Sequence, residues 1–234
     1  MSRDALTRRS SKGEIDAFVK RALQKPTPAR APLQRLIFAL DATASRQPTW
    51  DRACELQGTM FSAAASLGGI AIQPAWYRGV GEFRTGPWST DAQSLLATMN
   101  KVTCAGGLTQ IRRVLAHAEA EAKRQRIRGL VFVGDCCEED PAVLLAIAGR
   151  LGVLGVPLFM FQEGRQGTAQ GVFAALAKRT KGAHLTFDHH SADQLCALLT
   201  AVAVYAAGGA SALDALARDR GGVVRQLTHQ LDRS

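Results

Sequence analysis

Three oxygen-bearing side chains stand at alternate positions, Asp41, Thr43 and Ser45, directly after an apolar run in the sequence. In an extended or tightly turning loop, residues i, i+2 and i+4 project to one side, so all three can direct oxygens at one point. One carboxylate and two hydroxyls suit a hard cation such as Mg²⁺, which takes oxygen ligands in an octahedron and keeps several waters. The spacing therefore predicts a magnesium site, although Ser and Thr after a strand are also common turn and helix-capping residues.

Two further stretches supply the same kinds of groups. Residues 129–135 (GLVFVGD) form a second apolar run that ends in an acid, and residues 104–109 (CAGGLT) form a glycine-rich loop that places a threonine at the start of a helix. Together with the D-x-T-x-S pattern, these stretches resemble the three-part metal-ion-dependent adhesion site of von Willebrand factor A (VWA) domains. The resemblance covers residues 34–206, with the three motifs in the family's order.

The resemblance implies a ligand set and a mode of binding. Thr43, Ser45 and Thr109 would supply hydroxyl oxygens to Mg²⁺, and Asp41 and Asp135 would bind the ion directly or through water. One coordination position would remain for an Asp or Glu side chain of a partner protein. Mn²⁺ or Ca²⁺ would substitute for Mg²⁺ in such a site.

The sequence departs from the family pattern at three places. Thr43 stands where Ser is usual, Leu108 is inserted before Thr109, and Cys136 follows Asp135 where Gly is usual. The first change keeps a hydroxyl. The inserted Leu108 affects where Thr109 lies, and Cys136 affects the backbone geometry after Asp135. The alternative is that all these polar residues only cap helices.

The elements that must position these side chains follow from the apolar periodicity. Strands are predicted at 35–41, 70–77, 79–84, 129–134, 157–162 and 183–187. Helices are predicted at 48–67, 90–100, 109–128, 140–151, 168–180 and 191–207. This alternation predicts an α/β, Rossmann-like fold: a mostly parallel six-stranded sheet with one antiparallel edge strand, residues 79–84, and helices on both faces.

The acids are expected to meet at one edge of this sheet. Ligands of open α/β sheets bind beyond the carboxyl ends of the strands, where the winding order reverses. If the strand order resembles that of VWA domains, the strands 35–41 and 129–134 are neighbours at that point, and Asp41 faces Asp135.

Three regions are expected along the chain. Residues 1–33 form a polar extension, in which a capping box predicts a short amphipathic helix at 12–24 before a Pro-rich linker at 25–32. Residues 34–207 form the VWA-like domain, and residues 208–234 form a polar helical C-terminal tail.

Composition narrows the class of protein. The 234 residues are 47% hydrophobic and 21% charged, as in soluble globular proteins. We find no secretory signal and no charge-free apolar segment of about 18 residues, so no membrane span is expected. Five cysteines without zinc-site spacing fit reduced thiols, and a cytoplasmic location is expected. The net charge of +9 is widely spread, without a basic stripe interleaved with aromatic residues, so nucleic acid is not the expected partner.

Other chemistry is less well supported by the residues. Phosphoryl transfer through an aspartyl nucleophile generally uses a second carboxylate two residues on, where this chain has Thr43. The vicinal pair Cys136 and Cys137 could form a redox switch or be inert. Glu138 and Glu139 could reinforce metal binding or only solvate their loop.

These observations predict a function. We expect a cytoplasmic, Mg²⁺-dependent protein-interaction module without enzymatic activity. Its resemblance to bacterial intracellular VWA proteins implies a multiprotein complex, with an AAA-type ATPase or a chaperone-like machine as partner. The alternatives are a metal-dependent phosphate-ester hydrolase acting at the same site and an RNA-associated binding protein.

Overall fold

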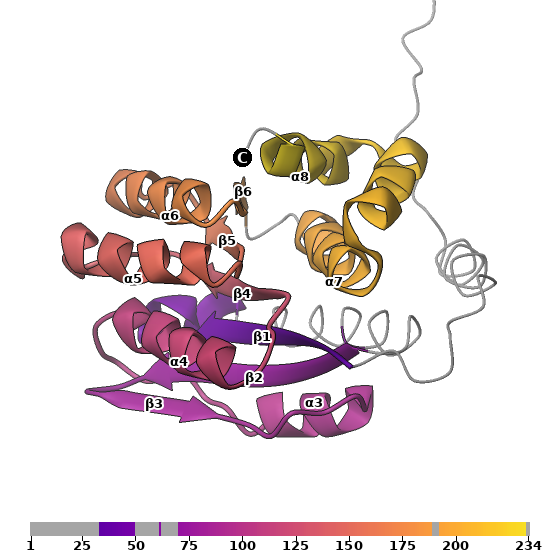
Figure 1. Cartoon of the computed structure of the whole chain (residues 1–234). Coiled ribbons are helices and arrows are strands. Elements are labelled where there is room, and N and C mark those ends of the chain that lie inside the picture. Colours follow the sequence, from indigo (N-terminus) through magenta and orange to yellow (C-terminus); the bar gives the residue numbers. More distant parts are fainter. Residues whose placement is uncertain (1–32, 50–60, 62–69, 189–191, 233–234) are drawn as a thin grey trace, which may run out of the picture. The chain divides into compact units, whose positions relative to one another are not determined.

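The strands form one sheet in the order β3-β2-β1-β4-β5-β6 (Figure 1). The structure is a computed structural model that describes residues 33–49, 61, 70–188 and 192–232. The strands are β1 (Gln34–Asp41), β2 (Ile70–Arg78), β3 (Glu82–Thr85), β4 (Gly129–Gly134), β5 (Leu158–Glu163) and β6 (Ala183–Phe187). All neighbours pair in parallel except β2 and β3, which are antiparallel at one edge. The predicted Rossmann-like fold class is confirmed.

Helices cover both faces of the sheet (Figure 1). They are η1, a 3₁₀ helix (Ala44–Thr49), α3 (Ala92–Met99), α4 (Ile111–Arg124), α5 (Pro141–Val153), α6 (Gly167–Arg179), α7 (Ala192–Arg220) and α8 (Gly222–Asp232). Helices α4, α5 and α6 lie on one face, and α3 and α7 lie on the other. Because both faces are covered, the inner strands carry continuous apolar runs, and every residue of β4 is buried.

An aromatic cluster forms the centre of the core beneath α4, α5 and α6. The Phe132 ring stacks on Tyr77 with centroids 6.3 Å apart and meets Phe173 edge-on at 5.5 Å. Tyr77 belongs to β2, and its phenol oxygen reaches the carboxyl end of β1. The core therefore fixes the position of one side chain of the candidate site.

The turn between β2 and β3 differs from the sequence prediction. Gly79 and Gly81 have φ values of 57° and 76°, in the left-handed region that favours glycine. Residues 79–81 therefore form the turn, and the strand predicted at 79–84 begins only at Glu82. Helix α4 is also shorter than the predicted helix at 109–128, because Gln125 is already extended.

The segment after Gly208 packs on the sheet. Helix α7 continues to Arg220 across a kink at Gly209, and α8 contacts α7 and β6. The Gln230 side chain accepts from the backbone N–H of His184 and donates to its carbonyl, both at 2.8 Å. The described part of the expected polar C-terminal tail, residues 208–232, therefore covers an edge strand whose backbone groups would otherwise lack partners on that side.

Helix α7 corrects one statement made from the sequence. Residues 195–213 carry no charged side chain, so an apolar segment of about 18 residues does exist. The helix from Gln194 to Arg220 is long and apolar enough to cross a membrane by length and composition. Its packing against β1, β2 and α8 gives this composition a structural role inside the domain.

Several predictions lie outside the described residues. These are the amphipathic helix at 12–24, the linker at 25–32 and most of the helix at 48–67.

An ion-pair cluster between α4 and α5 gives a prediction about acid stability. Arg150 donates two hydrogen bonds to the Glu119 carboxylate, each at 2.9 Å, and Lys123 donates a third at 2.6 Å. These bonds, those from Arg150 foremost, lower the Glu119 pKa from 4.5 to about 2. A lowered folded-state pKa stabilises the fold above the unfolded-state pKa, and this contribution is lost as the pH falls toward about 2.

We therefore expect Glu119→Gln to lose stability relative to wild type at neutral pH, and the difference to shrink between about pH 5 and about pH 3. The difference will be modest, because Arg150 and Lys123 are more than half exposed and are screened by salt. Urea unfolding of both proteins across this range measures it. A difference that stays constant with pH would contradict the assignment.

Candidate functional site

Asp41 lies buried at the carboxyl end of β1, with both carboxylate oxygens engaged. Oδ1 accepts from the backbone N–H of Thr43 and Oδ2 from the Tyr77 hydroxyl, each at 2.8 Å. Burial raises the pKa of Asp41, and the nearby charge of Asp135 adds to this, although the hydrogen bonds act in the opposite direction. Burial, followed by the charge of Asp41, raises the pKa of Tyr77, so Tyr77 remains a hydrogen-bond donor. Sequence reasoning missed Tyr77, whose signal was a hydroxyl near the end of the adjacent strand.

The two hydroxyls of the D-x-T-x-S pattern lie together. Thr43 Oγ1 and Ser45 Oγ are 3.1 Å apart, where η1 begins. Thr43 is buried and Ser45 is exposed, so the pair lies between the core and solvent. The loop thus brings together two of the oxygens that the sequence predicted to converge.

Asp135 follows the end of β4, beside Asp41. A Cβ atom added at Gly134 would lie 3.3 Å from the Asp41 Cβ, so the two strand ends are in contact. Asp135 Oδ1 is buried and accepts no hydrogen bond from the residues that the structure describes. A buried carboxylate oxygen without a partner is costly, and a cation is one group that would satisfy it.

Thr109 is fixed by the loop that follows β4. Its backbone N–H donates to Glu138 Oε2 at 2.9 Å, and its Oγ1 accepts from the Glu138 N–H at 3.1 Å. Glu139 accepts from the backbone N–H groups of Ile111 and Arg112 at the start of α4. Both glutamates therefore cap the N-terminal end of this helix region, a role that the sequence analysis did not include.

The glycine-rich loop packs closely on the turn between β2 and β3. The backbone N–H of Ala105 donates to the carbonyl of Ala42 at 3.1 Å. The carbonyl of Ala105 accepts from the backbone N–H of Gly79 at 3.4 Å. A Cβ atom at Gly107 would lie only 2.0 Å from the carbonyl oxygen of Gly79, so this approach requires glycine.

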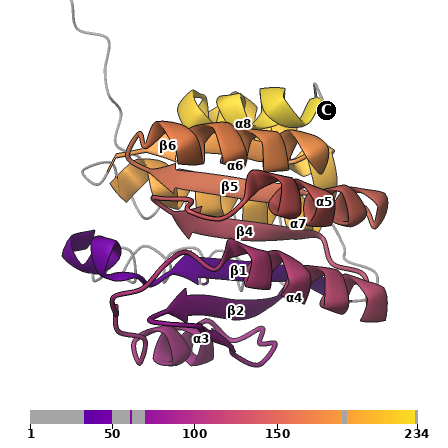
Figure 2. The same cartoon turned by 90° about the vertical axis from the view of Figure 1, so that its left-hand side faces the viewer.

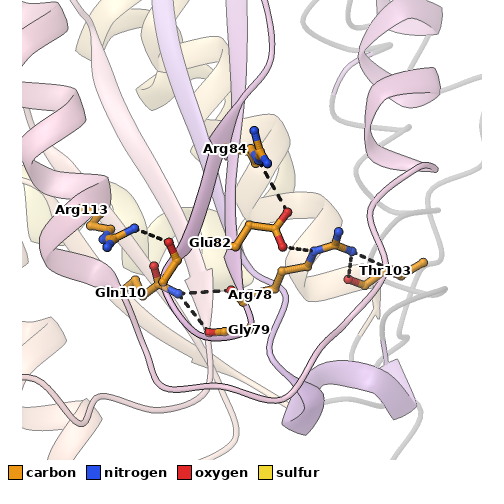
Figure 3. A network of polar contacts seen from close by, with 8 residues as sticks. Arg78, Gly79, Glu82, Arg84, Thr103, Gln110 and Arg113 are labelled. Carbon is orange, nitrogen blue, oxygen red and sulfur yellow. Dashed lines mark hydrogen bonds and ion pairs between the residues drawn. The ribbon is translucent and has the colours of Figure 1, made fainter.

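A polar network holds the same two segments together (Figure 3). Arg78 pairs with Glu82 at 3.0 Å and donates to the carbonyl and hydroxyl of Thr103 at 2.8 and 2.6 Å. The Gln110 amide donates to the carbonyls of Arg78 and Gly79, both at 3.3 Å. The loop that carries Thr109 is thereby attached at both of its ends.

A buried arginine also belongs to the site. Arg46, in η1, is 1% exposed and forms an ion pair with Glu163 at the end of β5. Burial lowers the Arg46 pKa, and the charges of Asp41 and then Asp135 counteract this. Sequence reasoning missed this pair, although an acid directly after a third buried strand was a visible signal.

The two vicinal cysteines are poor nucleophiles in this arrangement. Cys136 and Cys137 are free thiols, and burial raises the pKa of both. The negative charges of Glu138 and Asp135 raise the pKa of Cys136 further. Neither position favours the reactive thiolate form.

The donor set fits an oxygen-ligated cation such as Mg²⁺. The hydroxyls of Thr43 and Ser45 and the unpaired oxygen of Asp135 are hard ligands, and Mg²⁺ commonly takes only one or two carboxylates with several waters. In the described part of the chain, no three His, Cys, Asp or Glu side chains are grouped to hold a metal. The ligand roles of Asp41, Thr43, Ser45, Thr109 and Asp135 stay predictions.

Two exposed apolar side chains lie on the loops around these residues. Val80, in the turn between β2 and β3, is 100% exposed, and Leu108, in the glycine-rich loop, is 69% exposed. Because Gly79 and Gly107 are in contact, the two side chains project from adjoining segments. The carboxyl edge of the sheet thus combines acids and hydroxyls with exposed apolar groups.

Comparison with known proteins identifies the fold. Neither a family model nor a curated protein sequence matches the chain. Among solved structures, the SpRpn10 VWA domain matches with a TM-score of 0.58 and 13% identity, over 72% of this chain and 94% of that one.

Two bacterial structures match similarly. A von Willebrand factor type A structure from Catenulispora acidiphila has a TM-score of 0.57 and 13% identity, over 75% of this chain and 44% of that one. An aerotolerance-related membrane protein from Bacteroides fragilis has a TM-score of 0.53 and 14% identity, over 70% of this chain and 98% of that one. The chain therefore has the fold of a VWA domain.

Proposed function

We propose that this domain binds a partner protein at the carboxyl edge of its sheet, through a Mg²⁺ ion. Thr43, Ser45 and Asp135 would hold the ion, with Asp41 and Thr109 acting directly or through water. An Asp or Glu of the partner would complete the coordination. The observation that carries the proposal is the buried, unpaired Asp135 Oδ1 beside the strand end that leads into the Thr43–Ser45 hydroxyl pair.

The surroundings support a binding surface for a protein. Val80 and Leu108 offer apolar contacts next to the polar site, and protein interfaces combine such apolar groups with a polar rim. Hydrogen bonds from Arg78 and Gln110 hold the loops that carry these side chains. A surface held in this way loses little conformational entropy on binding, which favours affinity.

Binding rather than catalysis is the proposed role. Asp41 has both carboxylate oxygens engaged by Thr43 and Tyr77, so it is poorly placed to act as a nucleophile or a general base. A cytoplasmic location and an AAA-type ATPase or chaperone-like complex as partner are further parts of the proposal. They rest on the resemblance of the motifs to intracellular VWA proteins.

The metal is tested with Asp135→Asn. This variant removes a ligand charge without breaking a hydrogen bond at Oδ1, so the fold should persist. An ion that binds only the native state adds about 2.7 kcal/mol at a concentration of a hundred times its Kd. We expect Mg²⁺ to raise the melting temperature of wild type and to have little effect on Asp135→Asn.

Asp140→Asn is the matched control, because it makes the same change in the same loop. Asp140 caps α5 through the backbone N–H of Ala142 at 2.8 Å, and Asn is an equally good cap. It should keep the full response to Mg²⁺. Equal responses in all three proteins would contradict the proposed site.

The partner is tested by affinity capture from the native cell extract with wild type and Asp135→Asn. We expect a protein that wild type retains in Mg²⁺, loses in chelator, and that Asp135→Asn fails to retain. A partner retained equally in chelator would place the contact elsewhere on the domain.

A further inference from the structure

Arg46 spans the candidate site from one side to the other. It lies in η1, just after β1, where its backbone N–H donates to the carbonyl of Thr43 at 3.0 Å. Its ion-pair partner Glu163 ends β5, and β4 lies between β1 and β5 in the sheet (Figure 2). The side chain must therefore cross the carboxyl end of β4, where Asp135 follows Gly134.

Three acids line this crossing. Asp41, Asp135 and Glu163 stand at the ends of three adjacent parallel strands. Because Gly134 of β4 pairs with Gln162 of β5, the following residues, Asp135 and Glu163, lie at the same height along the two strands. Carboxylates at the ends of three neighbouring strands repel one another, and a positive charge between them reduces this repulsion. Arg46 brings a positive charge to this place from within the chain.

The burial of Arg46 indicates that its charge acts on the acids of the site and not on groups at the solvent-exposed surface. Its side chain is 1% exposed and that of Glu163 is 11% exposed. Burying a guanidinium is costly unless negative groups surround it, and here Asp41 and Asp135 favour its charged form. The acids and Arg46 therefore form one electrostatic unit.

We propose that the Arg46 guanidinium is a built-in counter-ion of the acidic site and competes with the metal ion for it. This inference rests on the proposed Mg²⁺ site. Two cations in one poorly solvated cluster repel each other, so an ion held by Asp135 displaces the guanidinium from its buried position. Ser45, the preceding residue, is exposed, so solvent is close to the start of this side chain.

The competition determines the metal affinity. In the metal-free protein Arg46 neutralises the acids, and part of the binding free energy of the ion is used to displace it. Metal binding thereby becomes coupled to a movement of η1, the segment that carries Ser45 and adjoins Thr43. A partner that supplies a further carboxylate favours the metal-bound arrangement.

The test is the Mg²⁺ affinity of the full chain, measured by isothermal titration calorimetry. We expect Arg46→Gln, which removes the charge, to bind Mg²⁺ at least about tenfold more tightly than wild type, and Arg46→Lys, which keeps it, to stay within about threefold. Arg46→Ala also removes the charge and should likewise tighten binding. It serves as the second variant if Arg46→Gln does not fold.

Arg165→Gln is the matched control for net charge, since Arg165 is exposed two residues beyond Glu163. It should leave the affinity unchanged. Equal, measurable affinities in wild type, Arg46→Gln and Arg46→Ala would overturn the counter-ion role of Arg46 while leaving the proposed function intact. Absence of Mg²⁺ binding in every variant would overturn both the proposed Mg²⁺ site and the counter-ion role of Arg46. Mg²⁺ binding by Arg46→Gln but not by wild type would support the competition, because it would mean that the guanidinium keeps the ion out of the wild-type site.

Discussion

Replacement of Gly107 by Ala should both destabilise the domain and weaken its metal binding. The added Cβ would lie 2.0 Å from the Gly79 carbonyl oxygen and 2.5 Å from its carbon, distances that require backbone to move. Separating the two loops strains the contact between Gly79 N–H and the Ala105 carbonyl. Overpacking of this kind typically costs about 1–3 kcal/mol. Because Thr109 is two residues away, we also expect the Mg²⁺ affinity to fall about tenfold.

Gly106→Ala is the control, because a Cβ at Gly106 would meet nothing within 4 Å. Neither glycine has the left-handed φ that would strain an alanine, so the two variants differ in packing alone. Urea unfolding and Mg²⁺ titration of both proteins measure the effects. Equal stability of Gly106→Ala and Gly107→Ala would show that the contact between the loops is not needed.

The sheet could be predicted from the sequence because local patterns specify it. Strands β1 and β4 are buried on both faces, and such strands appear as uninterrupted apolar runs such as 36–40 and 130–133. The start of β3 was placed too early because Gly79 to Gly81 fit a strand pattern as well as a turn. Only the left-handed φ values show that they form the turn.

Residue spacing predicted only those parts of the candidate site whose residues are close in the sequence, whereas the meeting of Asp41 and Asp135 was predicted from the expected strand order. The spacing alone predicted that the hydroxyls of Thr43 and Ser45 lie together, and they do. The contacts of Asp41 with Tyr77 and of Arg46 with Glu163 join residues far apart in the chain. Which side chain crosses which strand end depends on the sheet order and on packing, and no local pattern records it.

The C-terminal tail was set apart because polar residues outnumber apolar ones there. Its apolar residues nevertheless recur on one face of each helix, and tertiary packing buries them. They are Leu213, Leu216, Val224 and Leu227, each at most 2% exposed. A helix that is mostly polar can still be integral to a domain if one narrow stripe is buried.

A chain that ends at Ala207 should therefore fail to fold cooperatively. Full burial of a Leu or Val side chain contributes about 1.5–3 kcal/mol, so four of them contribute about 6–12 kcal/mol as an upper estimate. This is comparable with the whole net stability of a typical domain, about 5–15 kcal/mol. The truncation also removes Gln230, which binds both backbone groups of His184 on the edge strand β6.

Two point variants separate lost packing from other effects of truncation. Leu227→Ala removes a fully buried side chain and should cost about 2–5 kcal/mol, whereas Gln226→Ala changes an exposed neighbour on α8 and should stay within about 0.5 kcal/mol. Thermal and urea unfolding measure all three proteins against wild type. A chain ending at Ala207 that melts cooperatively near the wild-type temperature would contradict this argument, because β6 and α7 would then be stable without the helices that cover them. A small effect of Leu227→Ala would lead to the same conclusion, since it would mean that the buried face of α8 contributes little to the fold.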